Sequence, residues 1–304
     1  MVLSEQVNKV LAYIQSIEIE ENLTQWQAGR AFYEKFSPLA GSKEGVYLVK
    51  EHSIKYDAID ILLRVYQPYE GNMLPIIIYF HGGWFNAGSL ETHDIPLRKW
   101  SNQAQSTIIA VDYRLAPEYP FPFGLNDCMF AVEWIIDNAK ELNIDLNKIV
   151  IMGDSAGGAL ATAVTRKFRD KVIGQVLIYP VTDNSLNTDS WREYQDGPLL
   201  DLKGGAQAWE WYLQNDGDKT NPDAVPILAN DLSALPPTLV TVAEYDPLRD
   251  EAIHYVEKMK HYDVDVELKL YKGTIHGFFQ MGGFIEQTQV LMEDVVSFLK
   301  KVGV

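Results

Sequence analysis

One stretch of this 304-residue chain decides the fold that we expect: Lys148-Ile149-Val150-Ile151-Met152-Gly153-Asp154-Ser155-Ala156-Gly157. An apolar, β-branched run ends at Gly153, and a helical pattern begins directly after Ser155. The glycines permit a sharp turn from strand to helix, which holds the serine in a strained conformation with its hydroxyl exposed. A Gly-x-Ser-x-Gly match is common by chance, but its place between a strand and a helix indicates function. The sequence therefore predicts that Ser155 is a nucleophile.

Short apolar runs alternate with longer helical patterns from about residue 75 onward. This alternation is typical of a parallel sheet covered by helices on both faces, and two earlier strands are expected to form an antiparallel edge. The expected strands span residues 46–54, 60–67, 75–80, 107–113, 148–153, 173–179, 238–246 and 266–271. The expected covering helices span residues 126–142, 156–169, 247–261 and 287–300. The predicted fold class is therefore α/β.

Two segments stand outside this rhythm and are interpreted as a helical cap. Residues 1–45 show helical spacing before the sheet begins, whereas residues 182–224 are irregular and rich in aromatic side chains. We therefore divide the chain into N-terminal cap helices (1–45) and a catalytic domain (46–304) that carries a cap insertion at about 182–224. The alternative for the aromatic residues is a packing role in a core.

The composition argues against several classes of function. Asp and Glu total 42 against 26 Lys and Arg, and the net charge of -16 repels phosphate backbones and anionic lipid headgroups. We therefore expect neither a nucleic-acid partner nor a membrane partner. No apolar run approaches the roughly 20 residues of a membrane-spanning helix, and the N-terminal residues lack the pattern of a secretory signal, which favours the cytoplasm. The single cysteine, Cys128, and the lack of zinc-ligand spacing predict no metal site.

A serine hydroxyl requires a base within hydrogen-bond reach and an acid that orients the base. His276 lies in Gly273-Thr274-Ile275-His276-Gly277-Phe278, just after the last predicted strand, where a loop at the carboxyl edge of the sheet can reach back to Ser155. Four other histidines lie before the core sheet, in a polar loop or within a helix, and a surface or packing role is expected for them: His52, His93, His254 and His261. We therefore predict that His276 is the base.

The orienting acid is expected between the nucleophile and the base in chain order, at the end of another strand. Asp246 ends the run 238–246 and precedes Pro247, which prevents the strand from continuing. Glu244 and Asp250 are the alternatives, but Glu244 lies before the strand end and Asp250 lies inside the following helix. The terminal position favours Asp246.

Backbone amides near the nucleophile are candidates for stabilising the oxyanion that forms when an ester carbonyl is attacked. Gly82 and Gly83 follow the strand 75–80, and glycines bring their amides close to a substrate because they lack side chains. Ala156, next to the nucleophile, supplies a third amide. The alternative is an ordinary glycine turn, which the neighbouring elbow motif disfavours.

Five motifs together resemble the hormone-sensitive-lipase-like family of α/β-hydrolases, which includes many bacterial carboxylesterases and acetyl esterases. In the family's order they are His81-Gly82-Gly83, the segment 112–122, Gly153-Asp154-Ser155-Ala156-Gly157-Gly158, Asp246-Pro247-Leu248-Arg249-Asp250 and His276-Gly277-Phe278. The resemblance spans most of the chain.

This resemblance implies an α/β-hydrolase fold with an eight-stranded, mostly parallel sheet, a helical cap and a cofactor-free acyl-enzyme mechanism. It assigns the catalytic triad to Ser155, Asp246 and His276, and the oxyanion hole to Gly82, Gly83 and Ala156. Many members have a third glycine where this chain has Trp84, so we expect a differently shaped turn or alcohol-side pocket here.

Other residues have expected binding or structural roles. Trp84, Asp154 and Trp211 are predicted to contact the substrate. Arg114 and Glu118, four residues apart in the proline-bounded segment, are expected to form a pair that fixes this loop.

The function expected from these features is hydrolysis of short-chain acyl esters, because an aromatic-rich cap encloses a small site. One alternative is a non-catalytic small-molecule receptor on the same fold, which the presence of all three triad residues disfavours. Another is an amidase or peptidase that uses the same triad. The expected partner is a small-molecule ester, and the resemblance also allows a homodimer.

Overall fold

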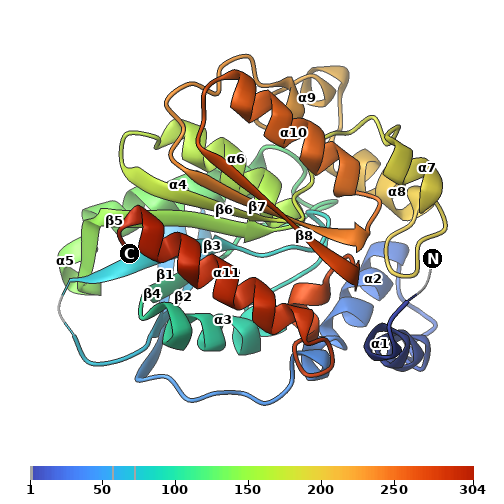
Figure 1. Cartoon of the computed structure of the whole chain (residues 1–304), viewed down its shortest axis with the longest axis horizontal. Helices are drawn as coiled ribbons and strands as arrows, with labels where there is room; N and C mark the ends of the chain where they lie inside the picture. Colours follow the sequence, from blue (N-terminus) through green and yellow to red (C-terminus); the bar gives the residue numbers. More distant parts are fainter. Residues whose placement is uncertain (1–2, 57, 72) are drawn as a thin grey trace.

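An eight-stranded sheet forms the centre of the molecule (Figure 1). The computed structural model describes residues 3–56, 58–71 and 73–304, so Met1 and Val2 of the predicted N-terminal cap lie outside the described residues. The strands are β1 Leu48–Tyr56, β2 Ile59–Gln67, β3 Leu74–Phe80, β4 Thr107–Asp112, β5 Ile144–Asp154, β6 Val172–Ile178, β7 Thr238–Tyr245 and β8 Val266–Ile275. Their order across the sheet is β1-β2-β4-β3-β5-β6-β7-β8.

The strand directions confirm the predicted mostly parallel α/β sheet. Strand β2 is antiparallel to β1 and β4, whereas the neighbouring pairs from β4 to β8 are parallel. The central strands are apolar on both faces, as parallel strands covered by helices must be; Ile76, Ile77 and Ile78 of β3 are each at most 1% exposed. The carboxyl ends of the parallel strands therefore meet at one edge, where their loops converge.

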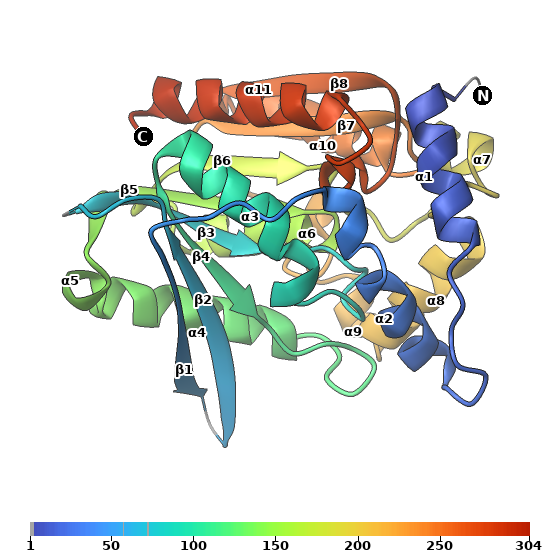
Figure 2. The ribbon, with the colours of Figure 1, turned by 90° about the horizontal axis from the view of Figure 1, so that it is seen from below.

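Helices cover both faces of the sheet (Figure 2). One face packs against α4 Phe123–Asp137, α6 Ala156–Lys167 and α10 Arg249–His261. The other face packs against α3 Leu90–Ala104 and α11 Gln287–Val302. The helices predicted to begin near residues 156, 247 and 287 are confirmed, whereas the helix predicted over 126–142 is divided at Asn138 into α4 and α5 Ala139–Leu142.

The placement of His93 in a polar loop is wrong, because this residue lies in the first turn of α3. A capping box begins the helix: the Ser89 amide donates to Thr92 Oγ1 (3.0 Å), and the Thr92 amide donates to Ser89 Oγ (3.3 Å). Burial of the apolar face, including Trp100, then stabilises the helix. Pro96 inside the helix obscures this pattern in the sequence, since proline usually ends a helix.

Short helices lie beyond the carboxyl ends of the strands. Those from the N-terminal region are α1 Glu5–Gln15, α2 Gln25–Glu34 and η1 Ser37–Ala40, and those from the predicted insertion are α7 Asp189–Glu193, α8 Leu202–Tyr212 and α9 Asp216–Lys219. Two further 3-10 turns are η2 Pro226–Leu228 and η3 Phe278–Met281. Figure 2 shows α1, α2, α7 and α8 gathered at one end of the molecule. This arrangement fits a cap, while the domain boundaries at 45 and at 182–224 stay predictions.

Glu251 on α10 anchors the start of the insertion. Its carboxylate accepts hydrogen bonds from the amides of Thr182 (2.7 Å) and Asp183 (3.2 Å) and from Trp191 Nε1 (2.8 Å). Burial raises the pKa of Glu251 to about 8, against the effect of the three N–H donors. Removal of this carboxylate leaves three donors without their acceptor.

We expect Glu251→Ala to lower the free energy of unfolding by about 3 kcal/mol, because each buried donor left unpaired costs roughly 1–3 kcal/mol. Urea denaturation followed by circular dichroism measures the change. Glu257→Ala is the matched control, since Glu257 lies on the same helix but is exposed and bonds Lys260. Equal unfolding free energies for Glu251→Ala and the wild type would contradict the anchoring role.

Candidate active site

Ser155 lies at a tight elbow between β5 and α6, with φ 53° and ψ -120°. Glycines on both sides make this turn feasible, because an ideal Cβ at Gly153 would lie 2.3 Å from the Gly157 carbonyl oxygen. A Cβ at Gly157 would lie 2.0 Å from the carbonyl oxygen of Phe80, at the end of β3. The Ser155 amide donates to the Ile178 carbonyl (2.8 Å), which ties the elbow to β6. The strained conformation is therefore held by the surrounding backbone.

The structure brings Ser155, His276 and Asp246 together from three separate loops. Ser155 Oγ lies 3.0 Å from His276 Nε2, and His276 Nδ1 lies 2.8 Å from Asp246 Oδ2. Asp246 is fully buried, and its Oδ1 also accepts the Leu248 amide (2.9 Å). An acceptor at Nδ1 places the proton there and leaves Nε2 free to accept the serine proton. This is the geometry that a serine nucleophile requires.

The alternative acids are engaged elsewhere. Glu244 Oε2 accepts the Gly273 amide (2.7 Å), and Asp250 accepts the Ser190 amide (2.8 Å) and pairs with Arg249 (2.8 Å). Because both alternatives are bound elsewhere, the acid favoured to orient His276 is Asp246, which directly follows β7.

One predicted oxyanion donor does not fit the structure. The Gly82 amide donates to Asp154 Oδ1 (2.7 Å), so this N–H is occupied inside the protein. Among the hydrogen bonds of the described residues, none is donated by the amides of Gly83, Trp84 or Ala156. Gly83 and Trp84 also line the cavity at Ser155. The amides of Gly83, Trp84 and Ala156 are therefore available near Ser155, whereas the Gly82 amide is bound to Asp154.

The carboxylate of Asp154, a predicted substrate contact, is bound within the protein. It borders the cavity, but its Oδ1 accepts from Gly82 and from the Tyr79 hydroxyl (2.6 Å) and lies 3.2 Å from His93 Nε2. Burial by itself raises the pKa of Asp154, but His93, Tyr79 and the Gly82 amide outweigh burial and hold this pKa below its usual value. Asp154 is thus a buried, charged group that holds the loop after β3 through the Gly82 amide.

His81 is a neutral part of the same loop. Burial and the neighbouring His93 lower the pKa of His81 to about 3. Its Nδ1 lies 2.9 Å from the Gly82 carbonyl oxygen, and its ring stacks on Tyr113 at 4.3 Å. This histidine therefore shapes the turn and carries no charge near neutral pH.

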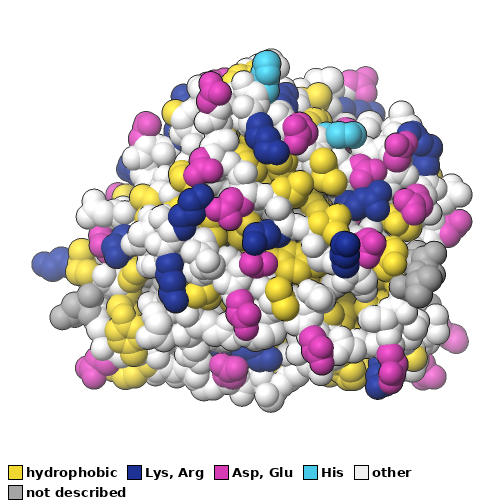
Figure 3. All heavy atoms as spheres, in the orientation of Figure 1, with side chains coloured by type: hydrophobic (Ala, Val, Ile, Leu, Met, Phe, Trp, Pro, Cys, Tyr) yellow, Lys and Arg dark blue, Asp and Glu magenta, His cyan; other side chains and the backbone are white. Residues whose placement is uncertain are grey.

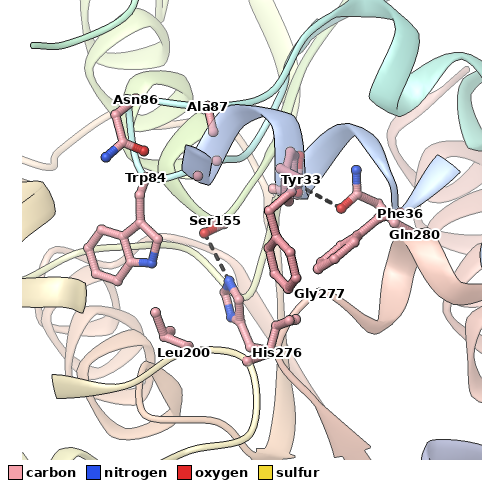
Figure 4. Close-up of a pocket in the computed structure, with 15 residues that line it drawn as sticks. Tyr33, Phe36, Trp84, Asn86, Ala87, Ser155, Leu200, His276, Gly277 and Gln280 are labelled. Carbon is pink, nitrogen blue, oxygen red and sulfur yellow. Dashed lines mark hydrogen bonds between the residues drawn. The ribbon is translucent and has the colours of Figure 1, made fainter. Parts of the chain in front are cut away.

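A cavity of about 220 Å³ opens above Ser155 (Figure 4). It is lined by Gly29, Phe32, Tyr33, Phe36, Gly83, Trp84, Asn86, Ala87, Asp154, Ser155, Leu199, Leu200, His276, Gly277 and Gln280. Trp84 lies at the wall and has a left-handed φ of 53°. Trp211 is not among the described residues that line this cavity; it is partly buried and packs against the hydrophobic core. Neither the aromatic residues of α2 nor Gln280 of η3 was predicted to line the cavity. The spacing of the aromatic residues in α2 is a sequence signal for the first of these.

Arg114 and Glu118 do not pair with each other, contrary to the prediction. Arg114 Nη2 bonds the buried Asp127 (2.5 Å), and Glu118 accepts from Arg30 of α2 (2.7 Å). Arg30 Nε also donates to the carbonyl oxygen of Asn86 (2.7 Å), so the cap helix contacts the loop that follows β3. The proline-bounded segment is not helical, and its charged side chains therefore find more distant partners.

The remaining surface carries little that points to another ligand. Acidic and basic side chains are interspersed over the face shown in Figure 3. Within the described residues, no group of His, Cys, Asp and Glu is arranged to hold a metal ion, and Cys128 is buried. No helix in the described part of the chain is both long enough and apolar enough to cross a bilayer.

Known proteins share this architecture. Residues 77–280 match the model of a family described as alpha/beta hydrolase fold. An arylesterase from Saccharolobus solfataricus is 35% identical over 275 residues, which cover 89% of this chain and 90% of the relative. The chain belongs to the hormone-sensitive-lipase-like family of α/β-hydrolases.

Further members of this family are similar over most of their length. An ethyl acetate hydrolase from Pseudomonas putida is 32% identical and matches 90% of this chain and 89% of its own. The solved structure of an esterase from Pyrobaculum calidifontis superposes with a TM-score of 0.90 at 36% identity and covers 100% of both chains. The α/β-hydrolase fold predicted from the motifs is confirmed.

We expect a fluorophosphonate probe to label Ser155, and Gly83→Ala to slow this labelling about 100-fold, the usual effect of losing one oxyanion donor. Gly83 has φ +126°, and a Cβ there would lie 2.2 Å from the Ala87 carbonyl oxygen, so the loop must shift. Mass spectrometry of timed reactions gives the rates. Gly29→Ala is the control, because Gly29 lines the same cavity but has open space at its Cβ. Equal labelling rates for the two variants would argue against the proposed use of this loop.

Proposed function

We propose that this enzyme hydrolyses small, short-chain acyl esters through a covalent acyl-enzyme at Ser155. The observation that carries the proposal is the unbroken pair of hydrogen bonds from Ser155 Oγ to His276 and from His276 to the buried Asp246. The coarser class, a carboxylic-ester hydrolase, is the activity named for the arylesterase and the ethyl acetate hydrolase of the same family.

In the first half-reaction, Ser155 Oγ attacks the ester carbonyl carbon while His276 Nε2 accepts the hydroxyl proton. Asp246 stabilises the imidazolium that forms. The carbonyl oxygen becomes an oxyanion, for which the amides of Gly83 and Trp84, together with that of Ala156, are the available donors. When the C–O bond breaks, His276 gives its proton to the departing alcohol.

In the second half-reaction, water takes the place of the alcohol. His276 accepts a proton from this water as its oxygen attacks the acyl carbonyl, and the same amides stabilise the second oxyanion. Collapse of this intermediate releases the acid and returns the proton to Ser155. The ester and one water molecule supply every atom that these steps require.

The dimensions of the cavity support small substrates. Its volume of about 220 Å³ lies below the roughly 300–1,000 Å³ of most ligand pockets. Aromatic side chains from α2 and Trp84 from the loop after β3 narrow it from opposite sides of Ser155 (Figure 4). Long acyl chains therefore have to displace packed aromatic residues.

Hydrolysis of p-nitrophenyl esters of graded acyl length tests the proposal. We expect kcat/KM to be highest from acetate to butyrate and to fall at least about tenfold for decanoate, since displacement of packed side chains costs 1.4 kcal/mol or more per tenfold loss. Ser155→Ala is expected to abolish turnover. Binding of esters with no turnover by the wild type would instead support a non-catalytic receptor.

Matched anilides separate the esterase from an amidase that uses the same triad. We expect p-nitroacetanilide to be cleaved at least about 1,000-fold more slowly than p-nitrophenyl acetate, because the amine leaving group requires fuller protonation in the transition state. Comparable kcat/KM values for both compounds would favour the amidase.

The oligomeric state and the cytoplasmic location stay hypotheses, and the open edge of the sheet supports a homodimer. Strand β8 has a neighbour on one side only, and Leu270 on β8 and Val290 on α11 are both exposed. Hydrophobic side chains gather over this part of the face in Figure 3. Light scattering is expected to give a dimer mass for the wild type and a monomer mass for Leu270→Lys.

A further inference from the structure

We infer that Tyr33, Gln280 and His93 form a positioning relay through which helix α2 holds the oxyanion loop, residues 81–88, in its reactive geometry. This inference rests on the proposed function of Ser155. None of the three relay residues contacts the reacting atoms through a catalytic hydrogen bond; each acts through the next.

The inner end of the relay is the Asp154 carboxylate. Its Oδ1 accepts the Gly82 amide (2.7 Å) and the Tyr79 hydroxyl (2.6 Å) and lies 3.2 Å from His93 Nε2. The side chains of Asp154 and His93 are 2% and 1% exposed, so no bulk water replaces these contacts. The bond to Gly82 fixes the peptide plane that precedes the available amides of Gly83 and Trp84.

The middle of the relay is the His93 ring, which is held on both of its nitrogens. Thr92 Oγ1 donates to the Ser89 carbonyl (2.9 Å) and therefore accepts from His93 Nδ1, 2.8 Å away. The other nitrogen, Nε2, accepts from Gln280 Nε2 (3.0 Å) and lies 3.2 Å from Asp154 Oδ1. The imidazole therefore transmits the position of Gln280 to Asp154.

Pro96 explains why Gln280 is bound here. In a regular helix, the amide of residue 96 donates to the carbonyl of Thr92, but proline has no N–H. The Thr92 carbonyl instead accepts from Gln280 Nε2 (3.3 Å). Pro96, which obscures α3 in the sequence, thus leaves the Thr92 carbonyl oxygen free to accept a hydrogen bond from Gln280 of η3.

The outer end of the relay lies at the cavity wall. The Tyr33 hydroxyl donates to Gln280 Oε1 (2.7 Å), and both residues line the cavity (Figure 4). The same helix holds the oxyanion loop from its other side, where Arg30 Nε donates to the Asn86 carbonyl oxygen. Helix α2 is therefore linked to the loop at two points, one buried and one near the surface.

The relay affects the transition state more than the ground state. Oxyanion donors strengthen their bonds only when charge develops on the carbonyl oxygen, so a loosened loop lowers kcat and leaves KM nearly constant. A residue that only supports folding instead lowers the fraction of active molecules and leaves the rate per active site unchanged.

The test compares four single variants, with the active sites counted by fluorophosphonate titration. We expect His93→Leu to lower kcat for p-nitrophenyl acetate about tenfold or more, with KM within about twofold. Tyr33→Phe is expected to lower kcat about threefold because the tyrosine is two steps further from the loop. His93→Gln keeps a polar side chain between Gln280 and Asp154 and is expected to return kcat to within about threefold of the wild type. The control is Tyr13→Phe, whose hydroxyl donates to the exposed Lys35 carbonyl, and it is expected to match the wild type.

A double variant decides whether Tyr33 acts through His93. If one relay connects them, Tyr33→Phe has no further effect in the His93→Leu background, whereas independent effects multiply. Multiplied effects would overturn the relay, as would a kcat per active site in Tyr33→Phe and His93→Leu equal to that of the wild type.

Amide hydrogen exchange provides a readout that does not depend on catalysis. We expect peptides that cover residues 81–88 to exchange at least about threefold faster in Tyr33→Phe and His93→Leu than in the wild type or Tyr13→Phe. If the wild type lacks esterase activity, the proposed function fails, and this measurement alone decides the relay. Unchanged exchange in both variants would then refute it.

Discussion

The close approach of helix α6 to the end of strand β3 is the constraint on which the rest of the site depends. The space between Gly157 and the Phe80 carbonyl oxygen is too small for a side chain, since an added Cβ would lie 2.0 Å from that oxygen. This contact sets the nucleophile elbow directly against the loop that follows β3. A larger residue at position 157 would separate Ser155 from the amides that are available to an oxyanion.

Polar groups are buried next to this contact. Asp154, which precedes the nucleophile, is buried beneath the loop and remains charged because Gly82, Tyr79 and His93 surround it. Buried charges are stable only when they are paired and hydrogen-bonded. The hydrogen bonds around Asp154 therefore fix the loop that follows β3. Trp84 lies in the same loop and keeps its left-handed φ because the surrounding contacts hold it.

The cap completes the site from above: its buried apolar residues join the two hydrophobic cores, and polar contacts fix its position. Arg30 and Tyr33 connect α2 to the loop and to η3, whereas Glu251 holds the start of the insertion on α10. Directional bonds of this kind place aromatic side chains over Ser155 with little freedom. The result is a small apolar cavity with the nucleophile at its floor.

The sequence by itself determined the sheet, the elbow and the three candidate catalytic residues, Ser155, Asp246 and His276. Local periodicity and short motifs at strand ends are enough to indicate these features. Only the tertiary structure decided which amides face the cavity, since the bond from Gly82 joins residues 72 positions apart. It also decided that Glu118 pairs with Arg30, 88 positions away, and that His93 is buried beside Asp154. Side-chain partners of this kind depend on how distant elements pack, and no local pattern encodes that packing.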